Sequence, residues 1–158
     1  MKRVLVAGIG NIFFGDDGFG VAVAQQLERA PMPEGTRVVD FGIRGVHLAF
    51  ELLEPHDLLV LVDATSRDGA PGTLYLIDPE ADTEALANAA PDSHTMDPCA
   101  VLAAVQQMGG TLPKTRIVGC EPDATRLDEG IGLSAPVQQA IEPAIAMIRR
   151  LIESEVTP

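Results

Sequence analysis

Cysteine is scarce in this 158-residue chain, and tryptophan is absent. Cys99 and Cys120 are the only two cysteines, and no CxxC pair exists. A domain of this length can bury roughly 70% of its unfolded surface, so it needs no disulfide for stability. We therefore expect a protein that works in a reducing, cytoplasmic setting.

Basic residues are also few, because 11 lysines and arginines face 23 aspartates and glutamates, for a net charge of −12. This charge repels nucleic acid and anionic lipid, so neither is expected as a partner. No apolar run approaches the ~20 residues of a membrane span. The run from Val4 to Ile9 is too short for the core of a signal peptide. Without repeats or linkers, residues 1–158 are expected to form a single domain.

Apolar runs of strand length recur along the chain. Residues 2–8 and 57–65 are almost continuously apolar, which is typical of parallel strands covered on both faces. The second of these is expected at the centre of the sheet. Residues 36–40 and 114–120 are predicted as further strands. Residues 72–78 follow a Pro-Gly turn, and their connection to the previous strand is too short for a helical crossover, so this strand is predicted to be an antiparallel edge.

Apolar residues at helical spacing predict four helices. They contain Val21, Ala24 and Leu27; residues 46–54; Val101, Leu102, Val105 and Met108, after a start at Asp97 and Pro98; and Val137, Ile141, Ile145, Ile148 and Ile152, after Ser134. Gly109 is expected to end the third helix, and Pro143 to kink or restart the fourth. The order of elements predicts an α/β fold: a three-layer α/β/α sandwich around a twisted, mostly parallel five-stranded sheet with one antiparallel edge strand.

A glycine-rich turn, residues 7–20, links the first strand to the first helix. Its GxG pair matches part of a dinucleotide fingerprint, but Phe13 occupies the position of the third glycine. No lysine follows Gly15, which excludes a phosphate-binding P-loop. Asp16 and Asp17 would also repel a phosphate. The turn therefore favours a cation, and no nucleotide cofactor is expected.

Two carboxylates and one imidazole are candidates for a metal site. Ligands of open α/β sheets gather at the carboxyl ends of the strands. Asp17 follows the first strand, Asp63 ends the central one, and His94 precedes a predicted helix. If the first and third strands are neighbours, this set suits zinc, nickel or iron. Each residue also has an ordinary alternative: a helix cap for Asp17, a bond to a neighbouring turn for Asp63, and an exposed loop position for His94.

Several motifs resemble those of the [NiFe]-hydrogenase maturation endopeptidases, and the similarity extends almost from end to end. They are GIGNIFFGDDGFG, VVDFGIRG, LLVLVDAT, PGTLYLI, SHTM, IVGCEPD and GLSAPVQQAIEPAI. The resemblance implies a protease that removes the C-terminal extension of a hydrogenase large-subunit precursor after nickel has been inserted. The alternative is a chaperone-like relative of the same fold that binds nickel without cutting.

The resemblance also implies the site residues. By motif, Asp17, Asp63 and His94 match the metal ligands of the family and are expected to take part in catalysis. Asp16 is a competing candidate, because this chain has aspartate where some members have the longer glutamate in the second position of the acid pair. Nickel is expected to arrive with the substrate, and zinc or cadmium to replace it in crystals. Whether nickel activates the scissile bond or serves only for recognition stays open.

The segment DFGIRG, 40–45, is expected to bind the substrate's tail. It leaves the second strand at the same edge as the acids. Asp40 begins the segment, Gly42 and Gly45 keep it open, and Arg44 can pair with a carboxylate or carbonyl of the peptide. A monomer is expected, because the enzyme must admit a large folded substrate.

Overall fold

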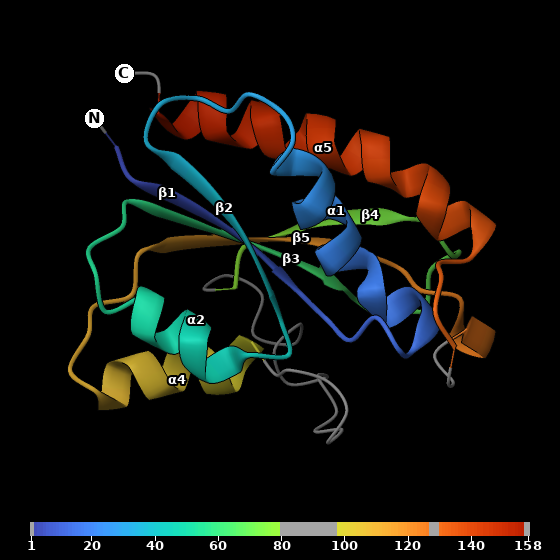
Figure 1. The fold of residues 1–158 in the computed structure, drawn as a ribbon, viewed down its shortest axis with the longest axis horizontal. Coiled ribbons are helices and arrows are strands. Elements are labelled where there is room, and N and C mark those ends of the chain that lie inside the picture. The colour runs from blue at the N-terminus through green and yellow to red at the C-terminus, as the bar shows by residue number, and fades with distance from the viewer. Residues whose placement is uncertain (1, 80–97, 127–129, 157–158) are drawn as a thin grey trace.

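Five strands form one twisted sheet in the computed structural model, which describes residues 2–79, 98–126 and 130–156 (Figure 1). The strands are β1 (Val4–Ile9), β2 (Thr36–Gly42), β3 (Leu58–Ala64), β4 (Leu74–Ile77) and β5 (Lys114–Cys120). Their order in the sheet is β2-β1-β3-β5-β4. All neighbouring pairs are parallel except β4 and β5. The central position of 57–65 and the antiparallel edge strand are therefore confirmed.

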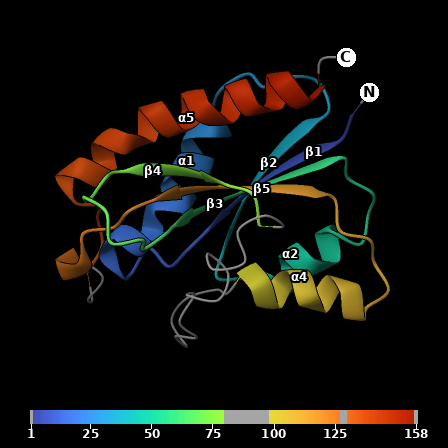
Figure 2. The ribbon, with the colours of Figure 1, turned by 180° about the vertical axis from the view of Figure 1, so that it is seen from behind.

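Helices cover both faces of the sheet, as the predicted three-layer sandwich requires. The helical segments are η1 (Gly15–Gly18), α1 (Phe19–Leu27), α2 (Gly45–Glu51), α4 (Pro98–Gln107), η2 (Ala124–Arg126) and α5 (Ala135–Val156). In Figures 1 and 2, α1 and α5 lie on one side of the sheet and α2 and α4 on the other.

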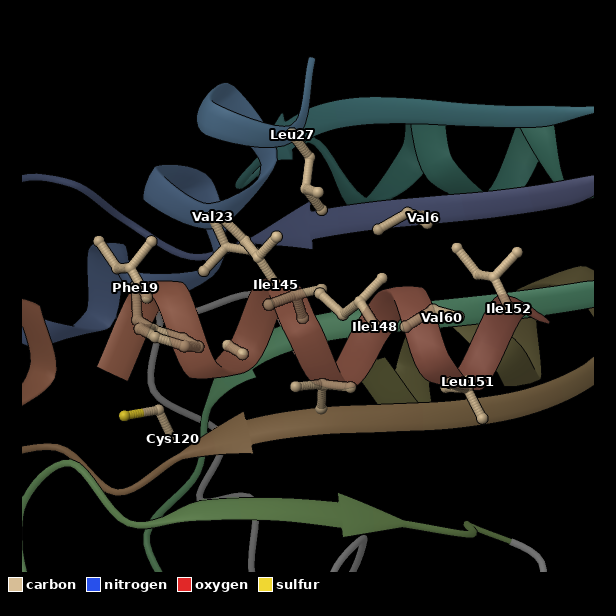
Figure 3. Close-up of a cluster of buried hydrophobic side chains, with 14 of the residues drawn as sticks. Val6, Phe19, Val23, Leu27, Val60, Cys120, Ile145, Ile148, Leu151 and Ile152 are labelled. Atoms are coloured by element: carbon tan, nitrogen blue, oxygen red, sulfur yellow. The ribbon is translucent and has the colours of Figure 1, made fainter. Parts of the chain in front are cut away.

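The continuous apolar runs of β1 and β3 follow from this double cover. Every residue of β1 is buried, as are the first five of β3. Because side chains alternate along a strand, Val4 and Val6 join the core under α1 and α5, whereas Leu5 and Ala7 join the core over α2 and α4. Figure 3 shows the first of these cores. Both cores hold the helices directly against the two central strands.

Three helices differ from the expected pattern, and the first of them, α2, ends at Glu51 and not at residue 54. Met108 lies beyond the end of α4 and is 45% exposed, so its predicted place in the apolar stripe is wrong. Gly109 follows with a φ of +84°, which suits glycine and ends the helix. The other long helix, α5, continues through Pro143 without a restart. Asp97, the predicted cap, lies outside the described residues.

No helix among the described residues is both long enough and apolar enough to cross a membrane.

The parallel strands end at one edge of the sheet. Ile9, Gly42, Ala64 and Cys120 are the last residues of β1, β2, β3 and β5. The acid turn, the DFGIRG segment and the residues after Asp63 all start from this edge. Ligand sites of open α/β sheets lie at such edges.

Candidate active site

The turn between β1 and α1 holds its acids in a single short helical turn, η1. Gly10 can occupy this turn because it has no side chain: its φ is +139°, and an added Cβ would lie 1.9 Å from the carbonyl oxygen of Asp17. The amide of Asn11 donates a hydrogen bond of 2.7 Å to Oδ2 of Asp17. The Asn11 side chain in turn accepts from the amide of Phe13 at 2.9 Å, as in an Asx turn. The sequence of this turn therefore fixes where the Asp17 carboxylate lies.

Asp63 is brought close to Asp17 by the packing of α1 on the sheet. β1 and β3 are paired neighbours, as the cation hypothesis required. An added Cβ on Gly20 would lie only 2.0 Å from the carbonyl oxygen of Val62, so the start of α1 rests directly on the end of β3. Asp17 is 8% exposed, and Asp63 lies at the partly exposed end of its strand. Both acids therefore share one edge of the sheet.

The electrostatics of Asp63 support this closeness. Burial of its carboxyl group is the largest cause that raises its pKa well above the ordinary value of 3.8, and the negative charge of Asp17 raises it further. The amide of Ala64 donates to Oδ1 of Asp63 at 2.8 Å and acts in the opposite direction. Two carboxylates that repel each other in a poorly solvated place are suited to share a cation or a proton.

Asp16 is fully buried and has other hydrogen-bond partners than Asp17. Its Oδ1 accepts a hydrogen bond of 2.6 Å from the amide of Ser134. Its Oδ2 accepts one of 2.7 Å from the hydroxyl of Ser134 and one of 2.9 Å from the amide of Asp123. Both carboxylate oxygens therefore have donors from distant segments of the chain.

His94, the third predicted ligand, lies outside the described residues. Within residues 2–79, 98–126 and 130–156, no three histidine, cysteine or acidic side chains form a group that could hold a metal. The pair Asp17 and Asp63 is thus the described part of the predicted site, and the role of His94 stays a prediction.

The predicted substrate segment 40–45 lies beside the acid turn. The amide of Gly10 donates to the carbonyl of Gly42 at 3.0 Å, and Gly42 has a φ of +56°. Arg44 is exposed, and its guanidinium donates to the carbonyls of Phe41, at 3.1 Å, and Asp40. Gly45 begins α2, and Asp40 accepts from the side chain of Gln25 at 3.3 Å. The segment therefore lies at the same edge as the acid turn, and its role in binding a peptide stays a prediction.

Glu121 is a buried acid at the same edge that the sequence analysis missed. It directly follows β5 and is 5% exposed. Its Oε1 accepts hydrogen bonds from the amides of Arg67 and Gly69, at 2.7 and 3.0 Å, and from the hydroxyl of Tyr75, at 2.7 Å. This carboxylate holds the loop that leaves β3 just after Asp63. An acid directly after a buried strand was the available signal, similar to the position at the end of a strand that singled out Asp63.

Glu121→Ala is expected to destabilise the fold by about 3 kcal/mol, because it leaves a hydroxyl and two amides without their acceptor. Glu121→Gln is the matched control. Its amide oxygen can still accept from all three donors, so a loss of about 1 kcal/mol is expected. Urea unfolding at neutral pH measures both. Equal losses in the two variants would contradict the role of Oε1 as the common acceptor.

Cys120 lies at the edge but is unsuited to be a nucleophile. It is fully buried. Burial, followed by the charges of Asp16 and Glu121, raises its pKa to about 12. The thiolate is the reactive form of cysteine, so this thiol is inert at neutral pH. Cys120 therefore leaves the carboxylates as the candidates for chemistry at this edge.

The fold and the paired carboxylates at the carboxyl edge of the central strands place this protein in the class of α/β proteins with an acidic site at the sheet edge. Comparison with known sequences narrows the class. Residues 21–151 match the family model described as hydrogenase maturation protease. The hydrogenase 2 maturation protease of Escherichia coli K12 is 32% identical over 148 residues, which cover 92% of this chain and 88% of that relative. Coenzyme F420 hydrogenase subunit delta of Methanothermobacter thermautotrophicus is 32% identical over 154 residues, 92% of each chain.

Solved structures agree with the sequence comparison. The hydrogenase maturating endopeptidase HybD from E. coli superposes with a TM-score of 0.83 and 29% sequence identity, over 96% of this chain and 93% of that one. The chain belongs to the hydrogenase maturation protease family. The resemblance found in the motifs is thereby confirmed.

Proposed function

We propose that this protein is an endopeptidase that removes the C-terminal extension of a nickel-loaded [NiFe]-hydrogenase large-subunit precursor. Family membership supports protease activity. The observation that carries the proposal is the pair Asp17 and Asp63 at the sheet edge, where the charge of one raises the pKa of the other. Such a pair gains from a divalent cation between its members.

Nickel enters this scheme as part of the substrate. Asp17 and Asp63 supply carboxylate oxygens, and His94 is proposed as the third ligand. Carboxylates alone hold nickel less tightly than the thiolates of a metal centre, so the pair is suited to engage nickel that the precursor already carries. Precursor without nickel would then be bound poorly. Zinc or cadmium is expected to occupy the same ligands in crystals.

The chemistry we propose is hydrolysis of the peptide bond beside the bound nickel. A divalent ion in this position can polarise the scissile carbonyl or lower the pKa of an attacking water. Asp17, one member of the pair, is the residue that we propose accepts the proton of that water. The segment 40–45, with Asp40, Gly42, Arg44 and Gly45, would hold the peptide that leads to the scissile bond.

The working state we propose is a cytoplasmic monomer that uses no nucleotide. Phe13 occupies the position of the third glycine in a dinucleotide-binding turn, and no lysine follows Gly15. The negative charge of Asp17 and Asp63 also opposes an anion.

Incubation with purified precursor tests the proposal. We expect wild-type enzyme to shorten nickel-loaded precursor by the mass of one C-terminal peptide and to leave nickel-free precursor intact, as read by intact mass spectrometry. Cleavage of both forms would contradict the nickel requirement. Binding of loaded precursor without any cleavage would contradict the protease and leave the nickel-binding relative as the function.

A further inference from the structure

Asp16 and Asp17 are adjacent in sequence but differ in their surroundings. Asp17 bonds within its own turn, to the amide of Asn11. Asp16 instead bonds to Ser134 and Asp123, which are 118 and 107 residues away. Ser134 directly precedes α5, where the unpaired amides of a helix start favour a negative charge. Asp16 therefore ties the acid turn to the last helix and to the loop after β5.

The acid turn has one further tie to the same region. The amide of Gly15 donates to the carbonyl of Gly130, and the amide of Gly130 donates to the carbonyl of Phe13, both at 2.8 Å. These backbone bonds do not depend on any side chain. A variant of Asp16 would keep them, so the turn should remain folded while its exact position is less restrained.

The buried position of Asp16 sets it apart from a group that touches substrate. It is 0% exposed, and both of its oxygens already accept hydrogen bonds. A general base must reach the proton that it removes. Asp16 would have to lose its bonds to Ser134 to do so, whereas Asp17 lies on the side of Asp63.

We propose that Asp16 is a positioning residue: it anchors η1 to the start of α5 and so holds the Asp17 carboxylate where it can act together with Asp63. Three charge-assisted hydrogen bonds give this anchor more restraint than a neutral contact would. The inference rests on the proposed function, because cleavage of the precursor is its main readout.

Two variants loosen the anchor to different degrees. Ser134→Ala removes only the hydroxyl donor. Asp16→Asn places an amide group where Oδ2 accepts from Asp123, so two donors face each other there.

A displacement of about 1 Å at a catalytic group can cost ~100-fold in rate. We expect kcat to fall ~100-fold in Asp16→Asn and ~10-fold in Ser134→Ala, with a smaller change in KM. The double variant should be little slower than Asp16→Asn, because both changes act on the contacts of one atom, Oδ2 of Asp16.

The matched control is a core variant of equal stability. Ile152 is fully buried in α5 and lies 18 residues beyond Ser134, about 27 Å along the helix. The losses of stability in Ile152→Val and Ile152→Ala are expected to lie on either side of the loss in Asp16→Asn. Urea unfolding measures all three. The kcat of the two Ile152 variants should equal that of wild type. Asp17→Asn serves as the reference for loss of a group that contacts the nickel.

Each outcome decides the proposal. If Asp16→Asn cleaves as fast as the Ile152 variant of equal stability, Asp16 is only structural. If Asp16→Asn is as slow as Asp17→Asn while Ser134→Ala is normal, Asp16 is itself a catalytic residue. If wild type does not cleave at all, the proposed function fails, and amide exchange at Asn11 takes over as the readout. Its protection should fall at least ~10-fold in Asp16→Asn but not in Ile152→Val, and unchanged protection would overturn the anchor.

Discussion

Asp63→Asn is expected to make the protein more stable at pH 7 by about 2 kcal/mol. In the folded state burial and Asp17 raise the pKa of this carboxyl group above 3.8. The folded state therefore binds the proton more tightly than the unfolded chain does. The stability linked to this group is fully present below pH 3.8 and is lost as the pH rises through the raised pKa. Asparagine carries no charge and can still accept from the amide of Ala64.

The pH dependence makes this prediction specific. Urea unfolding should show little difference between wild type and Asp63→Asn near pH 4, and a growing advantage of the variant towards neutral pH. Asp57→Asn is the control, because it removes one negative charge from an exposed position that bonds the amide of Arg3. A change within about 0.5 kcal/mol is expected there. A variant at Asp63 that is less stable than wild type at pH 7 would contradict the repulsion.

Asp63→Asn should lower the activity of the protein while it raises the stability. Loss of one carboxylate that would engage nickel is expected to lower cleavage of loaded precursor by ~1,000-fold or more, since electrostatic stabilisation of this kind acts on the transition state. The gain in stability and the loss of activity would then come from one group. Such an opposition is typical of functional sites whose charges are held close together.

Gly20→Ala is expected to lower the free energy of unfolding strongly. An added Cβ would lie 2.0 Å from the carbonyl oxygen of Val62 and 2.3 Å from that of Ile9, both of them backbone atoms of the central strands. Helix α1 would have to move off the sheet. We expect a loss of about 3 kcal/mol or more, which corresponds to a fall in melting temperature of roughly 6–12 °C for a domain of this size.

Gly109→Ala separates this contact from the general effect of replacing a glycine. Gly109 has a φ of +84°, but a Cβ there would meet no atom within 4 Å. Only the cost of a left-handed alanine is expected, about 1 kcal/mol. Thermal unfolding of the two variants provides the comparison. A loss in Gly20→Ala no greater than in Gly109→Ala would show that α1 can move away from β3 at little cost.

The elements carried by continuous apolar runs could be predicted from the sequence. Residues 114–120 form a strand with the predicted bounds, and β1 and β3 are neighbours, so Asp17 and Asp63 meet at one edge. Burial on both faces of a parallel strand leaves a simple local pattern that is readable without the structure. Helix ends were less certain: α4 ends before Met108, because the final turn of a helix depends on what covers it.

The interactions around the acids could not be read in the same way. Asp16 and Asp17 appear equivalent in the sequence, and only the fold shows that one bonds to Ser134 and the other to Asn11. Glu121 likewise has its partners more than 40 residues earlier, on the β3–β4 loop and on β4. Hydrogen bonds between distant segments leave no local periodicity, so the division of roles among these acids needed the three-dimensional structure.

The intact mass of nickel-loaded large-subunit precursor, measured after incubation with wild type and with Asp17→Asn, tests the central claim most directly. Our account predicts that wild type removes a single C-terminal peptide and that Asp17→Asn leaves the precursor at full length over the same period. Asp17 would then be required for the action of the enzyme on the loaded substrate. A precursor that keeps its full mass with wild type, or that Asp17→Asn shortens at the wild-type rate, would contradict the account.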